Sequence, residues 1–265
     1  MTCGCGIDWD DAFANPPYIA GAADYPARWA QQAARFRAAH ADAASEMTAG
    51  RAFDLFRPQG GARGLVVFVH GGFWRAFGRS DWSHLAAGGL ARGYAVALPG
   101  YTLAPKARLP EMTAQIAAAL TAAATEVAGP IHLAGHSAGG HLVTRMLCAD
   151  VALAPAVRAR LARVVSISGL HDLRPLRLTQ LNDVLQLTEK SALAESVALQ
   201  RPRDPVPVTA WVGGAERPEF LRQSALLAEA WGSQASLVVE PGRHHFDVID
   251  GLRDPDSPLM TTLLG

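Results

Sequence analysis

The 265-residue sequence lacks the features of disulfide-rich, disordered and nucleic-acid-binding proteins. It contains only three cysteines (Cys3, Cys5 and Cys148), which cannot all pair, and a chain of this length needs no disulfide framework. Neither sign of charge is in excess, because 24 Lys and Arg residues balance 24 Asp and Glu residues. This balance argues against a nucleic-acid partner. Hydrophobic residues make up 49% of the chain, which is too many for a disordered segment.

Long apolar runs are also missing, since no stretch of 18 or more apolar residues occurs. The first five residues have neither the basic residues nor the apolar run of a signal peptide. We therefore expect a cytoplasmic protein that has no membrane partner. Cys3 and Cys5 are followed by no cysteine or histidine pair at zinc-site spacing, so we expect no metal there. The sequence shows no Gly-rich phosphate loop, no PLP-lysine context and no metal-ligand cluster, so we expect no cofactor.

Short apolar runs alternate with helix-like segments along most of the chain. The runs from residue 65 onward are mostly continuous, as in strands that are covered on both faces. This alternation predicts a single α/β domain over residues 1–265, with a mostly parallel sheet and helices on both faces. The apolar runs are 53–56, 65–69, 94–98, 131–135, 164–168, 208–213 and 236–240, and the helix-like segments are 81–92, 111–127, 139–150 and 219–231.

Two stretches depart from the alternation. The N-terminal 1–50 is helical in character, with a helix expected over 24–47. Residues 170–205 contain three prolines around a helix-like middle, and we expect this insertion to form a small cap over the carboxyl ends of the strands.

The strongest motif is Gly-His-Ser-Ala-Gly at 135–139, directly after an apolar run. It is the G-x-S-x-G pattern of a nucleophile elbow, a sharp strand-to-helix turn that exposes the serine hydroxyl. Gly135 and Gly139 are small because side chains on either side of so tight a turn would collide. The pattern predicts that Ser137 is a nucleophile, which needs a neighbouring base for activation.

A second loop, His-Gly-Gly-Phe-Trp at 70–74, follows an earlier apolar run. It resembles the HGGG-type loop of α/β-hydrolase esterases, in which backbone N–H groups stabilise the oxyanion of the reaction. His70 is expected to brace this loop by hydrogen bonding. The amides expected to form the oxyanion hole are those of Gly71, Gly72, Phe73 and Ala138.

The order expected on such a fold is serine, then an acid, then histidine. Only His244 and His245 follow the last strands, and their positions alone do not separate them as the base. Three carboxylates compete to orient that base. A turn after the penultimate strand favours Glu216, while Asp172 and Asp247 remain alternatives.

These motifs together resemble the kynurenine formamidase (arylformamidase) branch of the α/β-hydrolase superfamily. In that family the acid precedes a Pro-Glu-Phe stretch and the base stands immediately before a phenylalanine, which favours Glu216 and His245 here. The family's acid is commonly aspartate, and its loop often reads HGGYW rather than HGGFW. The resemblance covers about residues 15–255 and rests on the segments 70–74, 135–141, 168–176, 212–224 and 244–249.

The resemblance implies a small-molecule substrate, an aryl formamide such as N-formylkynurenine. A narrow acyl pocket is expected beside an apolar wall for the aromatic leaving group. The alternative functions are a carboxylesterase or thioesterase for small acyl groups, and a hydrolase-fold protein that binds a small molecule without turnover. A homodimer is compatible with the neutral net charge. Candidates for the pocket are Trp74, Trp82, Tyr101 and His136, beside Phe73.

Overall fold

The computed structural model describes residues 6–40 and 52–265. Cys3, Cys5 and the end of the helix expected at 24–47 lie outside these residues. The described part of that helix is α2 (Tyr25–Ala39), which buries Trp29 and Ala33.

A seven-stranded sheet lies at the centre of the described part of the chain, in the order β1-β3-β2-β4-β5-β6-β7. Strand β1 is antiparallel to β3, and the remaining neighbours run parallel. Each apolar run named from the sequence forms one of these strands, so the predicted α/β fold is confirmed. The strands are β1 (Phe53–Phe56), β2 (Leu65–Val69), β3 (Ala95–Pro99), β4 (Ile131–His136), β5 (Leu161–Ile167), β6 (Val208–Gly213) and β7 (Ala235–Glu240).

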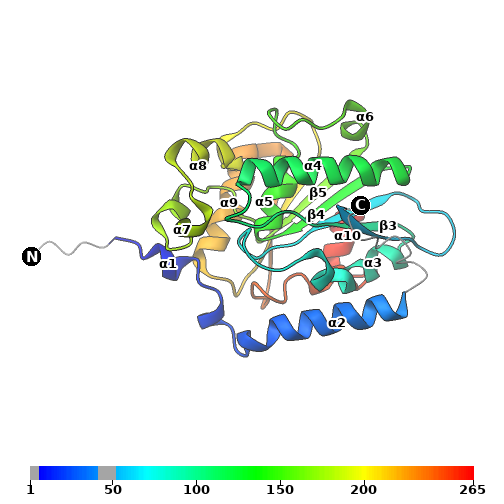
Figure 1. Ribbon diagram of the computed structural model, residues 1–265, viewed down its shortest axis with the longest axis horizontal. Helices are drawn as coiled ribbons and strands as arrows, with labels where there is room; N and C mark the ends of the chain where they lie inside the picture. The colour runs from blue at the N-terminus through cyan, green and yellow to red at the C-terminus, as the bar shows by residue number, and fades with distance from the viewer. Residues whose placement is uncertain (1–5, 41–51) are drawn as a thin grey trace, which may run out of the picture.

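Helices cover both faces of the sheet, and Figure 1 shows α2 and α4 on opposite sides of it. Strand β2 explains this arrangement, because its successive side chains point to opposite faces. Leu65, Val67 and Val69 pack into the core beneath α4 (Leu109–Glu126), α5 (Ala138–Arg145) and α9 (Pro218–Trp231). Val66 and Phe68 pack into a second core with α2, η3 (Arg79–Ala86) and α10 (Pro258–Leu264).

Shorter helices connect these layers. They are α1 (Trp9–Ala12), η1 (Pro16–Tyr18), η2 (Ala22–Asp24), α3 (Ala87–Ala91), α6 (Pro155–Arg158), η4 (Pro175–Leu178), α7 (Asn182–Leu185), α8 (Glu189–Glu195), η5 (Val197–Leu199), η6 (Gly232–Gln234) and η7 (Asp250–Arg253).

Strand β7 differs from the expectation that the apolar runs are covered on both faces. It lies at the edge of the sheet, and Leu237 and Val239 are 41% and 44% exposed. Its apolar sequence predicted a strand correctly, but its position at the sheet edge leaves one face without a covering helix.

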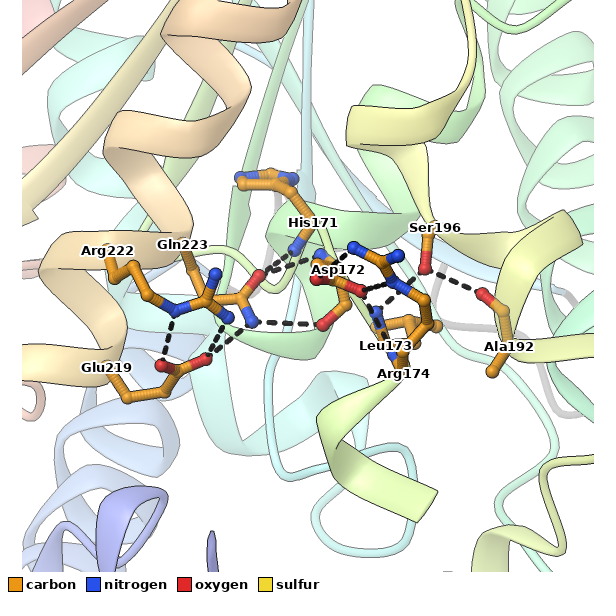
Figure 2. A network of polar contacts seen from close by, with 9 residues as sticks. All are labelled: His171, Asp172, Leu173, Arg174, Ala192, Ser196, Glu219, Arg222 and Gln223. Atoms are coloured by element: carbon orange, nitrogen blue, oxygen red, sulfur yellow. Dashed lines mark hydrogen bonds and ion pairs between the residues drawn. The ribbon is translucent and has the colours of Figure 1, made fainter. Parts of the chain in front are cut away.

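The insertion at 170–205 forms η4, α7, α8 and η5, and Figure 1 shows α7 and α8 at the same end of the molecule as α1. Its first loop is held between α8 and α9 by the polar network in Figure 2. Gln223 is wholly buried; its side-chain oxygen accepts from the N–H groups of His171 and Asp172 at 2.7 Å each. Its amide donates to the Asp172 carbonyl at 2.9 Å and to Glu219 at 2.7 Å. The loop after β5 is therefore rigidly attached to α9.

Candidate active site

Ser137 lies at the turn between β4 and α5, with the backbone angles φ 54° and ψ −118°. A side chain on Gly135 would place its Cβ 2.2 Å from the Gly139 carbonyl oxygen. A Cβ on Gly139 would lie 2.0 Å from the Val69 carbonyl oxygen. These contacts are impossible for any other residue, so the two glycines permit the turn. The unusual backbone of Ser137 is the strained geometry of a nucleophile elbow.

Helix α5 begins at Ala138, directly after Ser137. The first N–H groups of a helix have no acceptor within the helix, and the helix dipole favours negative charge beside them. The Ala138 amide is thus placed to donate to an oxyanion that forms on an acyl group bound to Ser137.

The loop predicted to supply further amides lies against the elbow. A Cβ on Gly71 would stand 3.0 Å from the Ser137 Cβ, so glycine allows this close approach. His70 donates from Nδ1 to the Gly71 carbonyl at 2.8 Å, and Tyr101 donates from its hydroxyl to the His70 carbonyl at 3.1 Å. The rings of His70 and Tyr101 also stack, with their centroids 4.6 Å apart. His70 therefore supports the shape of the loop.

His245 and Glu216 form a buried pair. The Nδ1 of His245 lies 2.6 Å from a Glu216 carboxylate oxygen, and the Glu216 side chain is wholly buried. The other carboxylate oxygen accepts from Gly213 N at 2.8 Å and from the Ser168 hydroxyl. With its Nδ1 proton donated to the carboxylate, the ring is held in the tautomer whose Nε2 is an acceptor. This arrangement is what a general base requires.

The alternative residues are engaged elsewhere. The Asp172 carboxylate binds Arg174 at 2.8 and 2.9 Å, as Figure 2 shows. Asp247 accepts from the His244 backbone at 2.8 Å, and the His244 ring contacts the Tyr25 hydroxyl at 3.1 Å. The His244 ring also lies 3.2 Å from the Asp247 carboxylate. Of the two histidines, however, only His245, which is paired with Glu216, lines the cavity that contains Ser137.

His136, the residue directly before Ser137, forms a hydrogen bond to the backbone of His245. Its Nε2 donates to the His245 backbone carbonyl at 2.9 Å, and the two rings lie 4.7 Å apart. Burial lowers the pKa of His136 well below its ordinary value, which keeps the ring neutral. His136 therefore fixes the base loop against the residue that precedes Ser137.

Further buried histidines lie around the elbow. Burial lowers the pKa of His70 to about 4 and the pKa of His141 and His171 to about 3. His141 donates from Nε2 to the Glu195 carbonyl at 2.9 Å, and His171 lies 3.2 Å from the Ser166 hydroxyl. These contacts give His141 and His171 structural roles.

A cavity of about 660 Å³ contains both Ser137 and His245. Phe73, Trp82 and His136 line it as predicted, but Trp74 and Tyr101 do not. Trp74 is wholly buried and packs edge-on against His141, because its backbone turns the ring into the core. Tyr101 lies behind the His70 loop, where its hydroxyl supports the backbone.

Sequence reasoning missed the other side of this cavity. It is formed by the segment between α1 and the middle of α2, and none of the residues 170–205, all of them described, lines it. The signal in the sequence was a turn-rich apolar stretch, PPYIAGAADYP at 16–26, that precedes the helix. The residues that this segment contributes are Asn15, Pro16, Ile19, Gly21, Ala22, Ala23, Pro26 and Trp29.

Within residues 6–40 and 52–265, no group of three His, Cys, Asp or Glu side chains is arranged to hold a metal ion. None of the helices described there has the length and apolarity needed to cross a membrane.

The fold and the elbow define an α/β hydrolase. Residues 66–260 match the model of the alpha/beta hydrolase family, so the chain belongs to that family and is a hydrolytic enzyme. An esterase from Pyrobaculum calidifontis shares the fold, with a TM-score of 0.61 and 18% identity over 89% of each chain.

More similar proteins confirm the resemblance to kynurenine formamidases. The kynurenine formamidase of Danio rerio is 28% identical over 81% of this chain and 77% of its own. That of Drosophila melanogaster is 30% identical over 75% and 71% of the two chains. A Silicibacter protein provisionally named a thioesterase is 51% identical, and its structure matches with a TM-score of 0.92 over 98% of this chain and 100% of that chain.

Proposed function

We propose that this chain is a serine hydrolase that cleaves aryl formamides to formate and an aryl amine. The observation that carries the mechanism is the 2.6 Å contact between His245 and Glu216, in a cavity that His245 shares with Ser137. The choice of an aryl formamide is supported by the kynurenine formamidase relatives and by aromatic side chains around the cavity.

The reaction would begin when His245 Nε2 accepts the Ser137 proton and Ser137 Oγ attacks the formyl carbon. The oxyanion would be stabilised by the Ala138 amide and by amides of the loop Gly71–Phe73, and each such donor contributes about 3–4 kcal/mol. Collapse breaks the C–N bond, and His245 protonates the departing nitrogen. Water, deprotonated by His245, then releases formate from the formyl-serine. Glu216 would hold the imidazole and stabilise its protonated form.

Hydrolysis of small esters or thioesters is the second candidate, because the Silicibacter relative is provisionally named a thioesterase. The same nucleophile and oxyanion donors would serve an amide, an ester or a thioester. Only the shape of the cavity would distinguish between these substrates.

Parallel assays on N-formylkynurenine, p-nitrophenyl acetate and an acetyl thioester would test both proposals. We expect the highest kcat/KM on the formamide, and labelling of Ser137 by a fluorophosphonate probe. Ser137→Ala should abolish both the hydrolysis and the labelling. Ser233→Ala, at an exposed serine, should change neither the hydrolysis nor the labelling. A protein that labels at Ser137 but cleaves only the ester or thioester would replace the first proposal with the second.

A further inference from the structure

The cavity that contains Ser137 is lined almost entirely by apolar and uncharged groups. Among the described residues that line it, Arg75 is the one side chain that carries a fixed charge, and no aspartate or glutamate lines it. His136 remains neutral because burial lowers its pKa. A charged group on a substrate would therefore meet one cation and no anion.

Arg75 is held at the rim of this cavity by its backbone. Its N–H and that of Ala76 both donate to the Gly72 carbonyl, at 3.0 and 3.1 Å. Gly72 belongs to the loop that we propose to bind the oxyanion, so Arg75 keeps a fixed relation to the reacting carbonyl. Arg75 is exposed and also lines the cavity, so its side chain is accessible to solvent and is not in the core.

The guanidinium of Arg75 forms no hydrogen bond or ion pair with any residue in the described part of the chain. Nearby arginines differ in this respect. Arg79 binds Asp54 at 2.8 Å, and Arg37 binds the Ser83 hydroxyl at 3.0 Å. A guanidinium has five N–H donors in a planar fork that matches a carboxylate. Arg75 thus offers an unused carboxylate-binding group beside an aromatic cavity.

We infer that Arg75 selects substrates whose aromatic leaving group carries a carboxylate, and that no ammonium group on the substrate is required. The inference rests on the proposed function, in which a formyl group is too small to carry the charge itself. The carboxylate must then belong to the leaving group, which extends from Ser137 along the apolar walls toward the rim. Because no carboxylate of the enzyme lines the cavity, an amino group on the substrate would gain no partner there.

Pairs of substrates that differ only in charge would test this inference. The 2-, 3- and 4-formamidobenzoates carry a carboxylate, and the corresponding formamidobenzamides are neutral molecules of nearly the same shape. In the wild-type enzyme we expect at least one acid to exceed its amide about tenfold in kcat/KM, as for one charge-assisted hydrogen-bonded pair. The preference for the acid should diminish in 0.5 M salt, since the proposed ion pair between Arg75 and the substrate carboxylate is exposed to solvent.

Arg75→Ala should bring the ratio of acid to amide to about one, and Arg75→Glu should reverse the preference. Arg75→Lys should retain part of it, because lysine keeps the charge but lacks the planar fork. Arg201→Ala is the matched control, since Arg201 is also exposed but does not line this cavity, and it should keep the wild-type ratio. An unchanged ratio in Arg75→Ala, or no preference for any acid in the wild type, would overturn the inference.

Two further measurements separate this inference from the proposed function. If the enzyme cleaves esters but not formamides, the acid-to-amide ratio of kcat/KM can be measured with acetoxybenzoates and acetoxybenzamides instead. A preference for the acids that depends on Arg75 would then support the inference, while the proposal of a formamide substrate would fail. Binding without turnover is measured by tryptophan fluorescence, to which Trp29 and Trp82 contribute from the wall of the cavity. Benzoate should bind the wild-type protein more tightly than benzamide and lose that advantage in Arg75→Ala; equal binding to the wild-type protein would contradict the inference.

Discussion

The two sides of the cavity are built by different interactions. On one side, His245, Glu216 and the elbow are fixed by buried hydrogen bonds, with Glu216 receiving three donors. On the other side, the segment 15–29 contributes apolar contacts through Pro16, Ile19 and Trp29. Hydrogen bonds specify position closely, whereas apolar contacts specify mainly volume. The first side is suited to chemistry and the second to the choice of substrate.

The largest effect should follow from a change of the carboxylate that holds the base. Glu216→Gln keeps the shape but favours the wrong tautomer of His245, and we expect kcat to fall by about 10⁴-fold. Asp172→Asn and Asp247→Asn are the matched controls, because both carboxylates bind other groups, and steady-state kinetics should show nearly wild-type rates. A large loss in either control with little loss in Glu216→Gln would assign the role elsewhere.

Acid should destabilise the folded protein through its buried histidines. His70, His136, His141 and His171 have lowered pKa values when folded, so the unfolded chain binds more protons below its ordinary histidine pKa of about 6.5. The stabilisation is complete above that pH and is lost as the pH falls toward the folded pKa values, which are about 4 for His70, about 3 for His141 and His171, and well below the ordinary value for His136. Between pH 6 and pH 5 the four sites together should lower the free energy of unfolding by about 5 kcal/mol.

Urea unfolding at pH 7, 6 and 5 would measure this loss. His141→Gln, which removes one of the four titrating groups, should flatten the dependence by about 1 kcal/mol per pH unit. His40→Gln is the control, because His40 directly follows α2 and is only partly buried. The stability of this variant should depend on pH as that of the wild type does. A stability that is constant down to pH 5 would contradict neutral, buried histidines at these positions.

The polar network around Gln223 should contribute somewhat less to the free energy of unfolding than the four histidines do together. Gln223→Leu would leave the buried N–H groups of His171 and Asp172 and the Asp172 carbonyl without partners, and we expect a loss of about 3 kcal/mol. Chemical denaturation would measure it. Gln59→Leu, at an exposed glutamine, should leave the unfolding midpoint unchanged, and equal effects of the two variants would argue against the network.

The smallest effect should come from the apolar side of the cavity. Ile19→Ala removes contact area from the wall, and we expect KM for an aryl formamide to rise about fivefold while kcat changes little. Ile7→Ala is a matched control, because Ile7 is 63% exposed and lies outside the cavity. A fall in kcat as large as that of Glu216→Gln would show that the two sides do not differ as described.

The placement of the residues on the hydrogen-bonded side of the cavity can be inferred from the sequence because its constraints are local. The elbow needs glycines two residues from Ser137, and this requirement is visible in five consecutive letters. Glu216 and His245 follow neighbouring parallel strands, β6 and β7, so their meeting at one sheet edge follows from topology.

The apolar side of the cavity, which the segment 15–29 forms, could not be predicted from local sequence patterns. Ile19 and Phe73 line one cavity although they are far apart in sequence, and nothing local to Ile19 indicates that contact. Trp74 and Tyr101 were wrongly expected in the cavity because the direction of each ring depends on backbone turns that residue types do not reveal. The exposed face of β7 was missed because apolar runs do not show whether a helix covers them.

Helix α5 has an unusual environment, since all eight residues from Ala138 to Arg145 are buried. Its Arg145 is neutralised by Glu195 and Asp150, at 3.1 and 2.6 Å. A helix enclosed in this way cannot fray into water, so its amide hydrogens should exchange only when the whole domain opens. Ser137 stands at the start of this helix, and the proposed nucleophile therefore belongs to the slowest-opening part of the molecule.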